Sequence, residues 1–178
     1  LAGNGARHIV VPGAPLLGAT IDTEADGQLT AGANGDDLTT SDDEDGVTFT
    51  SPLIRGQNAS VTVTASAPGV LSAWLDFNGD GNWTTAGDAI FVNVALAAGA
   101  NNLTFPVPAT ATTNLNTVAR FRLASAGGLS FTGLANDGEV EDHAVATAAE
   151  ADVVITKTDG AATEVPGTTV TYTIVASN

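Results

Sequence analysis

The chain contains no cysteine and no methionine, only two histidines, and only 5 lysines and arginines against 20 aspartates and glutamates. Without cysteine, no disulfide can stabilise the fold and no thiol can act as a nucleophile. The formal net charge of -15 repels nucleic acids and anionic membranes, so we expect cations as the natural partners and no nucleic-acid partner. The lack of an initiating methionine, a signal sequence and an anchor indicates a mature or excised piece of a protein.

Long hydrophobic runs are also missing, so we expect no segment that inserts into a membrane. The chain has instead short runs in which valine alternates with threonine or serine, a pattern that is typical of β-strands. Glycine and proline interrupt almost every connection and leave no room for a helix of ordinary length. Strands are predicted at residues 47–50, 60–65, 70–77, 89–96, 102–107, 117–125 and 139–147.

Seven short strands predict an all-β fold, an antiparallel β-sandwich of the jelly-roll or immunoglobulin-like (Ig-like) kind with long acidic loops. We expect most of residues 1–46, which are rich in glycine and aspartate, to form loop. A spacer of small and acidic residues near position 150 divides a sandwich domain at 1–149 from an incomplete Ig-like domain at 150–178. The second domain has only two predicted strands, 153–158 and 168–175. Because a lone hairpin is marginal in water, these strands should pack within the chain or add to a sheet of a neighbouring chain.

The strongest motif is the run Asp76-Phe77-Asn78-Gly79-Asp80-Gly81-Asn82-Trp83. It matches the first six positions of a calcium loop, in which oxygen ligands recur at alternate positions and a glycine permits a sharp turn. The predicted ligands are the side chains of Asp76, Asn78 and Asp80 and the carbonyl oxygen of Asn82. The twelfth position is glycine rather than glutamate, so Asp88, one place later, is predicted to close the coordination shell. The alternative is an ordinary Asn-Gly and Asp-Gly hairpin turn of solvated acids.

Two further acidic clusters supply candidate metal ligands. Asp43 and Asp45 belong to a group of six acids within eleven residues. A cation would relieve their mutual repulsion, although such a charge run is equally typical of a solvated loop. Glu139 and Glu141 share one face of their predicted strand with His143 and could reach a metal. Equally, either glutamate could pair with Arg120 or Arg122, and the spacing slightly favours that pairing.

Four runs in the chain together resemble the GEVED domain of large secreted or cell-surface bacterial proteins. They are Asp42-Asp43-Glu44-Asp45-Gly46-Val47, Trp74-Leu75-Asp76-Phe77-Asn78-Gly79-Asp80-Gly81-Asn82-Trp83, Ala119-Arg120-Phe121-Arg122 and Gly138-Glu139-Val140-Glu141-Asp142. The resemblance covers roughly residues 8–147, with His143 where the family commonly has tyrosine. Residues 151–178 resemble the opening of an Ig-like repeat of unknown function that occurs in tandem in bacterial surface proteins. Both resemblances imply a secreted or bacterial cell-surface location.

These features predict a non-catalytic, calcium-binding structural or adhesive module whose cofactor is Ca²⁺. One alternative is a subunit of an extracellular fibre that assembles by strand addition, with neighbouring chains as partners. Another is a calcium-dependent carbohydrate-binding module that recognises surface glycans, which would require Trp83 to be exposed, since Trp74 is expected in the core. We expect no enzyme. Catalysis would have to use Glu139 with Glu141, or His143 with a serine, and the chain has no nucleophile motif.

Overall fold

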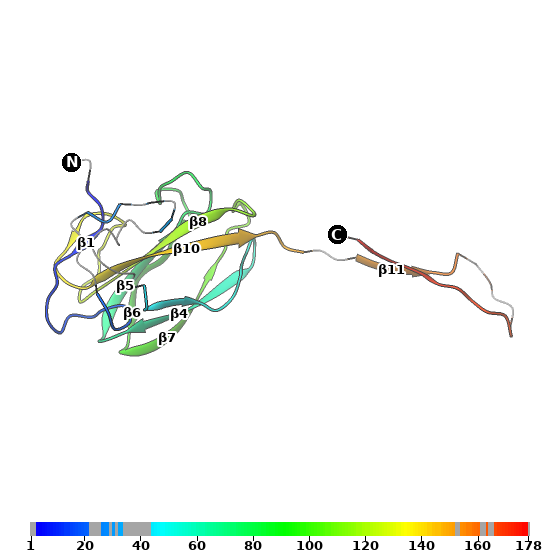
Figure 1. Ribbon diagram of the computed structural model, residues 1–178, viewed down its shortest axis with the longest axis horizontal. Coiled ribbons are helices and arrows are strands. Elements are labelled where there is room, and N and C mark those ends of the chain that lie inside the picture. The colour runs from blue at the N-terminus through cyan, green and yellow to red at the C-terminus, as the bar shows by residue number, and fades with distance from the viewer. Residues whose placement is uncertain are drawn as a thin grey trace.

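The computed structural model describes residues 3–21, 26–28, 30, 32–33, 44–151, 154–160, 163 and 166–177 (Figure 1). Within these residues it contains strands and loops only, which confirms the predicted all-β sandwich. None of the described segments forms a helix long and apolar enough to cross a membrane. The strand predicted at 89–96 is found with the same bounds, and the other six main strands are found within about three residues of their predicted ends.

Two sheets form the sandwich. The larger sheet has the order β3-β10-β8-β5-β6, and the smaller sheet has the order β2-β4-β7. The larger sheet consists of β3 (Leu53–Ile54), β10 (Glu139–Ala148), β8 (Asn116–Ala124), β5 (Gly69–Leu75) and β6 (Ala89–Leu96). The smaller sheet consists of β2 (Val47–Phe49), β4 (Asn58–Ala65) and β7 (Gly99–Pro106).

Two short pairings depart from the antiparallel arrangement that the sequence predicts. β3 lies parallel to the end of β10, and β1 (Arg7–His8) lies parallel to β9 (Leu134–Ala135). Strands of two residues are too short to show an alternating pattern, which is why the sequence did not predict β1, β3 and β9. The pair β1-β9 joins the beginning of the chain to the segment that precedes β10.

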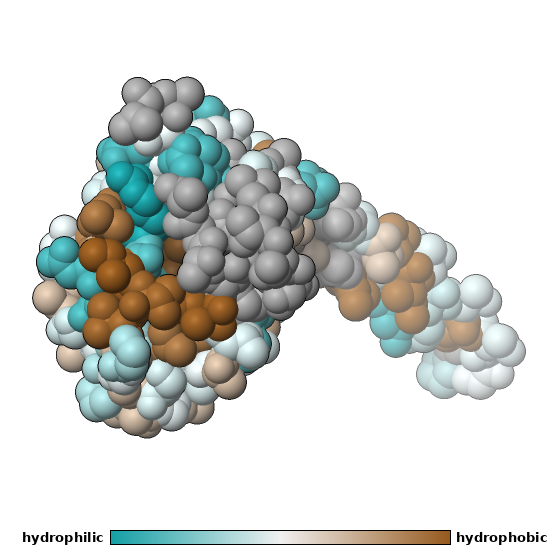
Figure 2. Space-filling model, turned by 60° about the vertical axis from the view of Figure 1, so that its left-hand side comes forward, coloured by the Kyte–Doolittle hydropathy of each residue, from teal (hydrophilic) through white to brown (hydrophobic). Residues whose placement is uncertain are grey.

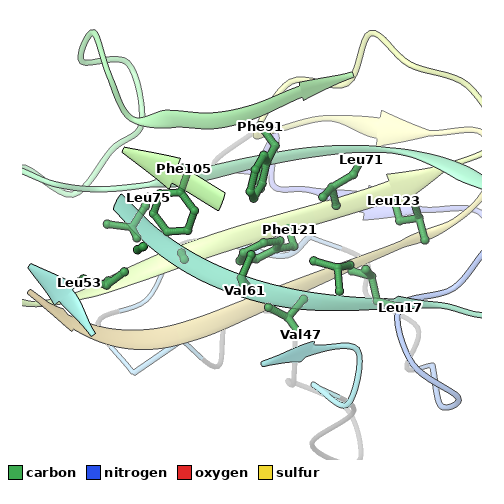
Figure 3. Packing of buried hydrophobic residues seen from close by; sticks show 14 of the residues in the cluster. Leu17, Val47, Leu53, Val61, Leu71, Leu75, Phe91, Phe105, Phe121 and Leu123 are labelled. Atoms are coloured by element: carbon green, nitrogen blue, oxygen red, sulfur yellow. The ribbon is translucent and has the colours of Figure 1, made fainter. Parts of the chain in front are cut away.

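The hydrophobic core fills the space between the two sheets (Figure 3). In β4 every second residue is buried, from Ala59 to Ala65, as expected for a strand with one face toward a core. The rings of Phe91 and Phe105, from β6 and β7, pack edge to face with their centroids 5.6 Å apart. Leu17, from the part of the chain expected to be loop, is fully buried in the same core.

The larger sheet is also covered on its outer face. Almost every residue of β8 is buried, which means that both faces of this strand are shielded from water. A second apolar cluster on the outer face contains Trp74, Trp83 and Val118, with Phe131 packed against it. The sheet is therefore a middle layer between the smaller sheet and a cover of loops.

The last two strands, β11 (Val154–Thr158) and β12 (Thr173–Ser177), form an antiparallel hairpin, and the second strand begins at Thr173 rather than at the predicted residue 168. The hairpin projects away from the sandwich (Figures 1 and 2). Its apolar side chains are largely exposed, with exposed fractions of 68% for Ile155 and 65% for Ile174. The sandwich itself also carries exposed apolar residues, and Figure 2 shows a continuous apolar area on one of its faces. Around β1 and β9 the exposed apolar residues are Ile9, Val10, Val11 and Leu134.

Candidate functional site

The predicted calcium loop, residues 76–88, connects β5 to β6. Its first and last acids, Asp76 and Asp88, stand directly at the ends of the two paired strands. The amide of Leu75 donates a hydrogen bond of 2.8 Å to the carbonyl oxygen of Asp88. Antiparallel pairing therefore brings the two acids together at the base of the loop. Both are buried, with exposed fractions of 3% for Asp76 and 1% for Asp88.

The carboxylate of Asp76 organises the turn that follows it. Its Oδ1 accepts a hydrogen bond of 2.7 Å from the amide of Gly79, and its Oδ2 accepts one of 2.9 Å from the amide of Gly81. Both glycines have positive φ angles, 74° and 79°, which residues with a Cβ atom seldom adopt. The sharp turn that the sequence predicts at Gly81 is therefore present, and the loop curls around the Asp76 carboxylate.

Asn78, Asp80 and Asn82 lie farther out on the same loop. Asn78 Nδ2 donates to Asp80 Oδ2 at 2.9 Å, and the amide of Asn82 donates to Asp80 Oδ1 at 3.0 Å. The hydrogen bond from Asn78 is the largest influence that lowers the pKa of Asp80 below its ordinary value. Asp80 is therefore a carboxylate at neutral pH, which is the state that a cation requires.

The pKa of Asp88 is shifted in the opposite direction, above its ordinary value. Its Oδ2 accepts a hydrogen bond of 3.1 Å from the amide of Thr85, but burial raises its pKa, and the charges of Asp76 and Asp80 raise it further. Three carboxylates thus repel one another across the loop. The ion pairs of the described residues, Arg120 with Asp142 and His143 with Glu141, do not include any of the three.

The five predicted ligands thus lie on one loop, but they do not form a finished coordination sphere. Among the described residues, no group of three or more aspartate, glutamate and histidine side chains is arranged to hold a metal ion. The carboxylates point toward backbone amides, as they would in a plain turn. A cation at this loop would need the Asn78 side chain and backbone carbonyl oxygens as ligands in addition to carboxylates.

The second group of predicted ligands lies elsewhere. Asp43 falls outside the described residues, as do the acids at positions 36, 37 and 42. Glu139 Oε2 accepts a hydrogen bond of 2.6 Å from the amide of Leu17, and Glu141 Oε1 accepts one of 2.8 Å from the amide of Gly46. Asp45 accepts from the amide of Ala19 at 3.0 Å. We call Asp45, Glu139 and Glu141 the acidic clamp, because together they hold residues 17–19 and 46 against β10.

Gly18 explains how the chain passes through the acidic clamp. Its φ is +68°, and a Cβ atom at this position would lie 1.7 Å from Oδ1 of Asp45. Its own amide donates to the carbonyl oxygen of Thr64 in β4 at 2.8 Å. The segment at residues 17–19 is therefore bound both to the acidic clamp and to the smaller sheet. Whether Asp43, Asp45, Glu139 and Glu141 also hold a metal stays a prediction.

The alternative pairing of Glu139 or Glu141 with an arginine is not what the structure contains. In the register of β8 with β10, Glu139 lies opposite Leu123 and Glu141 lies opposite Phe121, so both glutamates share a face with core residues. Arg120 lies opposite Asp142 instead, and its Nε and Nη2 donate to the two carboxylate oxygens at 2.7 and 2.6 Å. The residues alternate along each strand, so a pairing offset by one position places the arginine on the other face of the sheet.

Residues 70–146 match the sequence model of the GEVED domain. The chain contains a GEVED domain. No curated protein and no solved structure matches the chain. The match begins in β5 and ends in β10, so the GEVED domain includes the acidic loop, the two buried arginines and the glutamates of the acidic clamp. The pentapeptide Gly138-Glu139-Val140-Glu141-Asp142 opens β10.

The fold of the GEVED domain depends on residues before the matched segment. Ala6 and Leu17 are fully buried, and the three strands of the smaller sheet include two that precede residue 70. Two carboxylates of the pentapeptide are bound to backbone amides of this earlier part. The described residues of this earlier part therefore belong to the same folded unit as the matched segment at 70–146.

Sequence reasoning missed the network that joins His8 to Arg122 of the GEVED domain. Arg122 Nε donates to His8 Nε2 at 3.0 Å, and the other His8 ring nitrogen lies 2.6 Å from the carbonyl oxygen of Asp137. Burial and the charge of Arg122 lower the pKa of His8 to about 3, so the imidazole is neutral. Arg122 also donates to the carbonyl oxygens of Ser130, Thr132, Gly133 and Arg7. A lone histidine in a loop-like segment gives no sequence signal for such a contact.

Both tryptophans are buried, with exposed fractions of 7% for Trp74 and 5% for Trp83. The expectation that Trp74 lies in the core is confirmed. Trp83 packs between Phe131, with ring centroids 5.9 Å apart, and the guanidinium of Arg120, which lies 4.8 Å from the Trp83 ring. Trp83 is thus an anchor of the acidic loop and does not present an exposed ring to a sugar.

Proposed function

We propose that this chain is a non-catalytic structural module of a secreted or cell-surface protein, and that its acidic loop at residues 76–88 binds a calcium ion. The observation that carries the proposal is the shape and charge of this loop: two glycines with positive φ let the backbone turn around Asp76, and the charges of Asp76 and Asp80 raise the pKa of Asp88. Acids that disfavour one another's ionisation and take part in no ion pair among the described residues favour a hard cation, which would remove their mutual repulsion.

The surroundings of the loop give an ion room to enter. A pocket of about 250 Å³ lies beside Asp76 and is bordered by Gly79, Gly81 and Thr117. Calcium commonly keeps water molecules among its six to eight oxygen ligands, so a pocket next to the carboxylate suits its coordination. The side chains of Asn78 and Asp80 are exposed and can turn toward an ion without disturbing the core.

The energetic benefit would be modest and useful. At an extracellular calcium concentration of about 1 mM, a site with a dissociation constant of about 0.1 mM adds about 1.4 kcal/mol to the free energy of unfolding. A domain without disulfides has a free energy of unfolding of roughly 5–15 kcal/mol, so this contribution is a substantial fraction of the total.

A non-catalytic role agrees with the state of the candidate acids and bases. Glu139 and Glu141 are buried, and their carboxylates accept hydrogen bonds from backbone amides. A general acid or base must reach a substrate proton, whereas these oxygens are engaged within the fold. Burial of both tryptophans likewise gives no support to carbohydrate recognition by an aromatic platform.

The test compares two aspartates that carry similar charges. Asp80→Asn removes a proposed ligand, while Asp137→Asn removes an equivalent charge from a residue that is bound to Ser125 and lies outside the loop. We expect calcium to raise the melting temperature of the wild-type chain and of Asp137→Asn, but not of Asp80→Asn. Equal responses of the two variants to calcium would contradict the proposal.

The exposed hairpin favours a second candidate function, assembly through strand addition. β11 and β12 present Ile155, Ile174 and Val175 to solvent, and an exposed apolar strand pair is a template for pairing with another chain. Under this proposal the added strand comes from a second copy of the chain. Sedimentation at increasing protein concentration tests it, because a chain that stays monomeric at high concentration in the presence and absence of calcium contradicts assembly.

A further inference from the structure

We infer that Arg120 and Asp142 are positioning residues for the acidic loop, and that they act on its affinity for calcium through Trp83. The inference rests on the proposed calcium site. It assigns a role to the last acid of the GEVED pentapeptide, which is not among the predicted metal ligands and lies on the opposite face of β10 from Glu139 and Glu141.

The first step is the attachment of the loop to the sheet. Trp83 Nε1 donates a hydrogen bond of 3.3 Å to the carbonyl oxygen of Val118, and the amide of Asp76 donates to the same oxygen at 3.3 Å. One carbonyl of β8 thus holds both the first predicted ligand and the residue that follows Asn82. The position of the Trp83 ring therefore fixes where the backbone carbonyl of Asn82 lies relative to the carboxylate of Asp76.

The second step is the support beneath the Trp83 ring. The guanidinium of Arg120 lies 4.8 Å from the ring centroid, within the range of a cation–π contact. Arg120 Nη1 donates to the carbonyl oxygen of Phe131 at 2.9 Å, and the Phe131 ring packs against Trp83 from another side. Trp83 is therefore held in a slot whose walls are Arg120 and Phe131.

The third step is the dependence of Arg120 on Asp142. The two side chains are almost completely buried and form a two-point pair at 2.7 and 2.6 Å. The two parallel hydrogen bonds to the carboxylate fix the plane and position of the buried guanidinium, and the ammonium group of a lysine cannot form both. Loss of that placement would let the guanidinium shift from the Trp83 ring and would loosen the loop at the point next to Asn82.

The consequence is an energetic connection between the pentapeptide and the loop. Residues that contact neither ligand nor ion can change an affinity by 0.5–2 kcal/mol when they support the binding element, which corresponds to a change of roughly 2- to 30-fold in a dissociation constant. We expect Arg120→Lys to raise the dissociation constant for calcium by a factor in this range, although it removes no metal ligand.

Arg122→Lys is a closely matched control. Arg122 is two residues farther along β8, shares its face with Arg120 and is equally buried, but its partners are carbonyl oxygens and His8. Both variants replace a buried guanidinium by an ammonium, so a general loss of stability affects both. The calcium affinity is measured by calorimetric titration of the full chain, at a temperature where each variant is folded.

A second variant covers the case in which Arg120→Lys does not fold. Trp83→Phe keeps an aromatic ring against Phe131 but removes the indole donor to Val118, and it too should weaken calcium binding. In addition, calcium should change the tryptophan fluorescence of Trp74→Phe, in which Trp83 is the only indole, and not that of Trp83→Phe.

The outcomes separate this inference from the proposed function. A wild-type chain that does not bind calcium contradicts both. A wild-type chain that binds calcium, with Arg120→Lys and Arg122→Lys changed equally or not at all, contradicts only the positioning role. If Arg120→Lys is unfolded, unchanged calcium affinity in Trp83→Phe overturns the inference in its place.

Discussion

Glu139 accepts a hydrogen bond of 2.6 Å at Oε2 from the backbone amide of Leu17, a residue 122 positions earlier in the chain. The contact is buried, and the side chain of Leu17 inserts into the core between the two sheets (Figure 3). The beginning of the chain is therefore part of the sandwich, and the GEVED pentapeptide provides one of the groups that hold it there.

Because the side chain of Leu17 is part of the core, shortening this side chain should strongly lower the stability of the sandwich. Leu17→Ala should lower the free energy of unfolding by about 3 kcal/mol, because it removes fully buried methyl groups and leaves a cavity. Leu134→Ala is the matched control, since Leu134 is 56% exposed and should change stability by less than about 0.5 kcal/mol. Denaturant unfolding of both variants measures the difference, and similar values for the two would mean that the early segment does not belong to the folded unit.

His8 predicts a specific sensitivity to acid. Its pKa in the folded chain is about 3, because of burial and the charge of Arg122, compared with 6.5 for a free side chain. The unfolded chain therefore binds a proton more readily, and stability that is complete above pH 6.5 is lost as the pH falls toward 3. At about 1.4 kcal/mol per pH unit, the loss between pH 7 and pH 5 is about 2 kcal/mol.

His8→Gln keeps a donor and an acceptor at this position but cannot be protonated. Between pH 7 and pH 5 the free energy of unfolding should therefore fall less in this variant than in the wild-type chain. The difference between the two falls should be about 2 kcal/mol. Denaturant unfolding at the two pH values makes the comparison. Parallel pH dependences would show that His8 is not held neutral in the folded chain.

Asp88 predicts that protons and calcium compete at the loop. Burial and the charges of Asp76 and Asp80 raise its pKa above the unfolded value, so in the absence of a cation its contribution to stability is lost as the pH rises through the folded pKa. A bound cation favours the carboxylate form of Asp88 and therefore competes with the proton. Calcium affinity should therefore fall from pH 7 to pH 5, and more steeply in the wild-type chain than in Asp88→Asn. Calorimetric titration at both pH values tests this, and an equal slope would remove Asp88 from the site.

Much of the sandwich could be predicted because its long strands carry clear local patterns. β4 and β6 alternate apolar and polar residues or are bounded by turn residues, and their limits follow from that pattern. The turn at Gly79 and Gly81 could be predicted in the same way, since its spacing is local. Leu17 was unpredictable as a core residue, because nothing near it in sequence shows which distant strand it meets.

The pairing of buried charges could not be predicted, because it depends on the register between strands. The spacing slightly favours a pairing of Glu139 or Glu141 with Arg120 or Arg122 over metal binding, whereas the register places Asp142 opposite Arg120. A shift of one residue exchanges the two faces of a strand. The spacing within each strand thus predicts which residues share a face. Which of these faces lies opposite which residues of the neighbouring strand follows only from the register.

The hairpin formed by β11 and β12 should not contribute to the stability of the sandwich. Because its strands are exposed and project from the sandwich (Figure 1), deletion of residues 151–178 should leave the melting temperature of the sandwich unchanged. The calcium response of the truncated chain should also be unchanged, since the hydrogen bonds of Asp76 and Trp83 in the loop at 76–88 lie within the sandwich. Thermal unfolding of both forms is the measurement, and a lowered melting temperature would mean that the hairpin packs on the sandwich in solution.

The most direct test of the calcium-binding account is a calorimetric titration of the chelator-stripped full chain with calcium. The account predicts saturable binding with a dissociation constant of about 1 mM or tighter, the range of extracellular calcium-binding modules, and loss of that binding in Asp80→Asn. A parallel titration with sodium chloride at matched ionic strength should give no saturable heat, because it only screens charge. Indistinguishable responses to the two salts would show that the acidic loop is a solvated turn and would contradict the account.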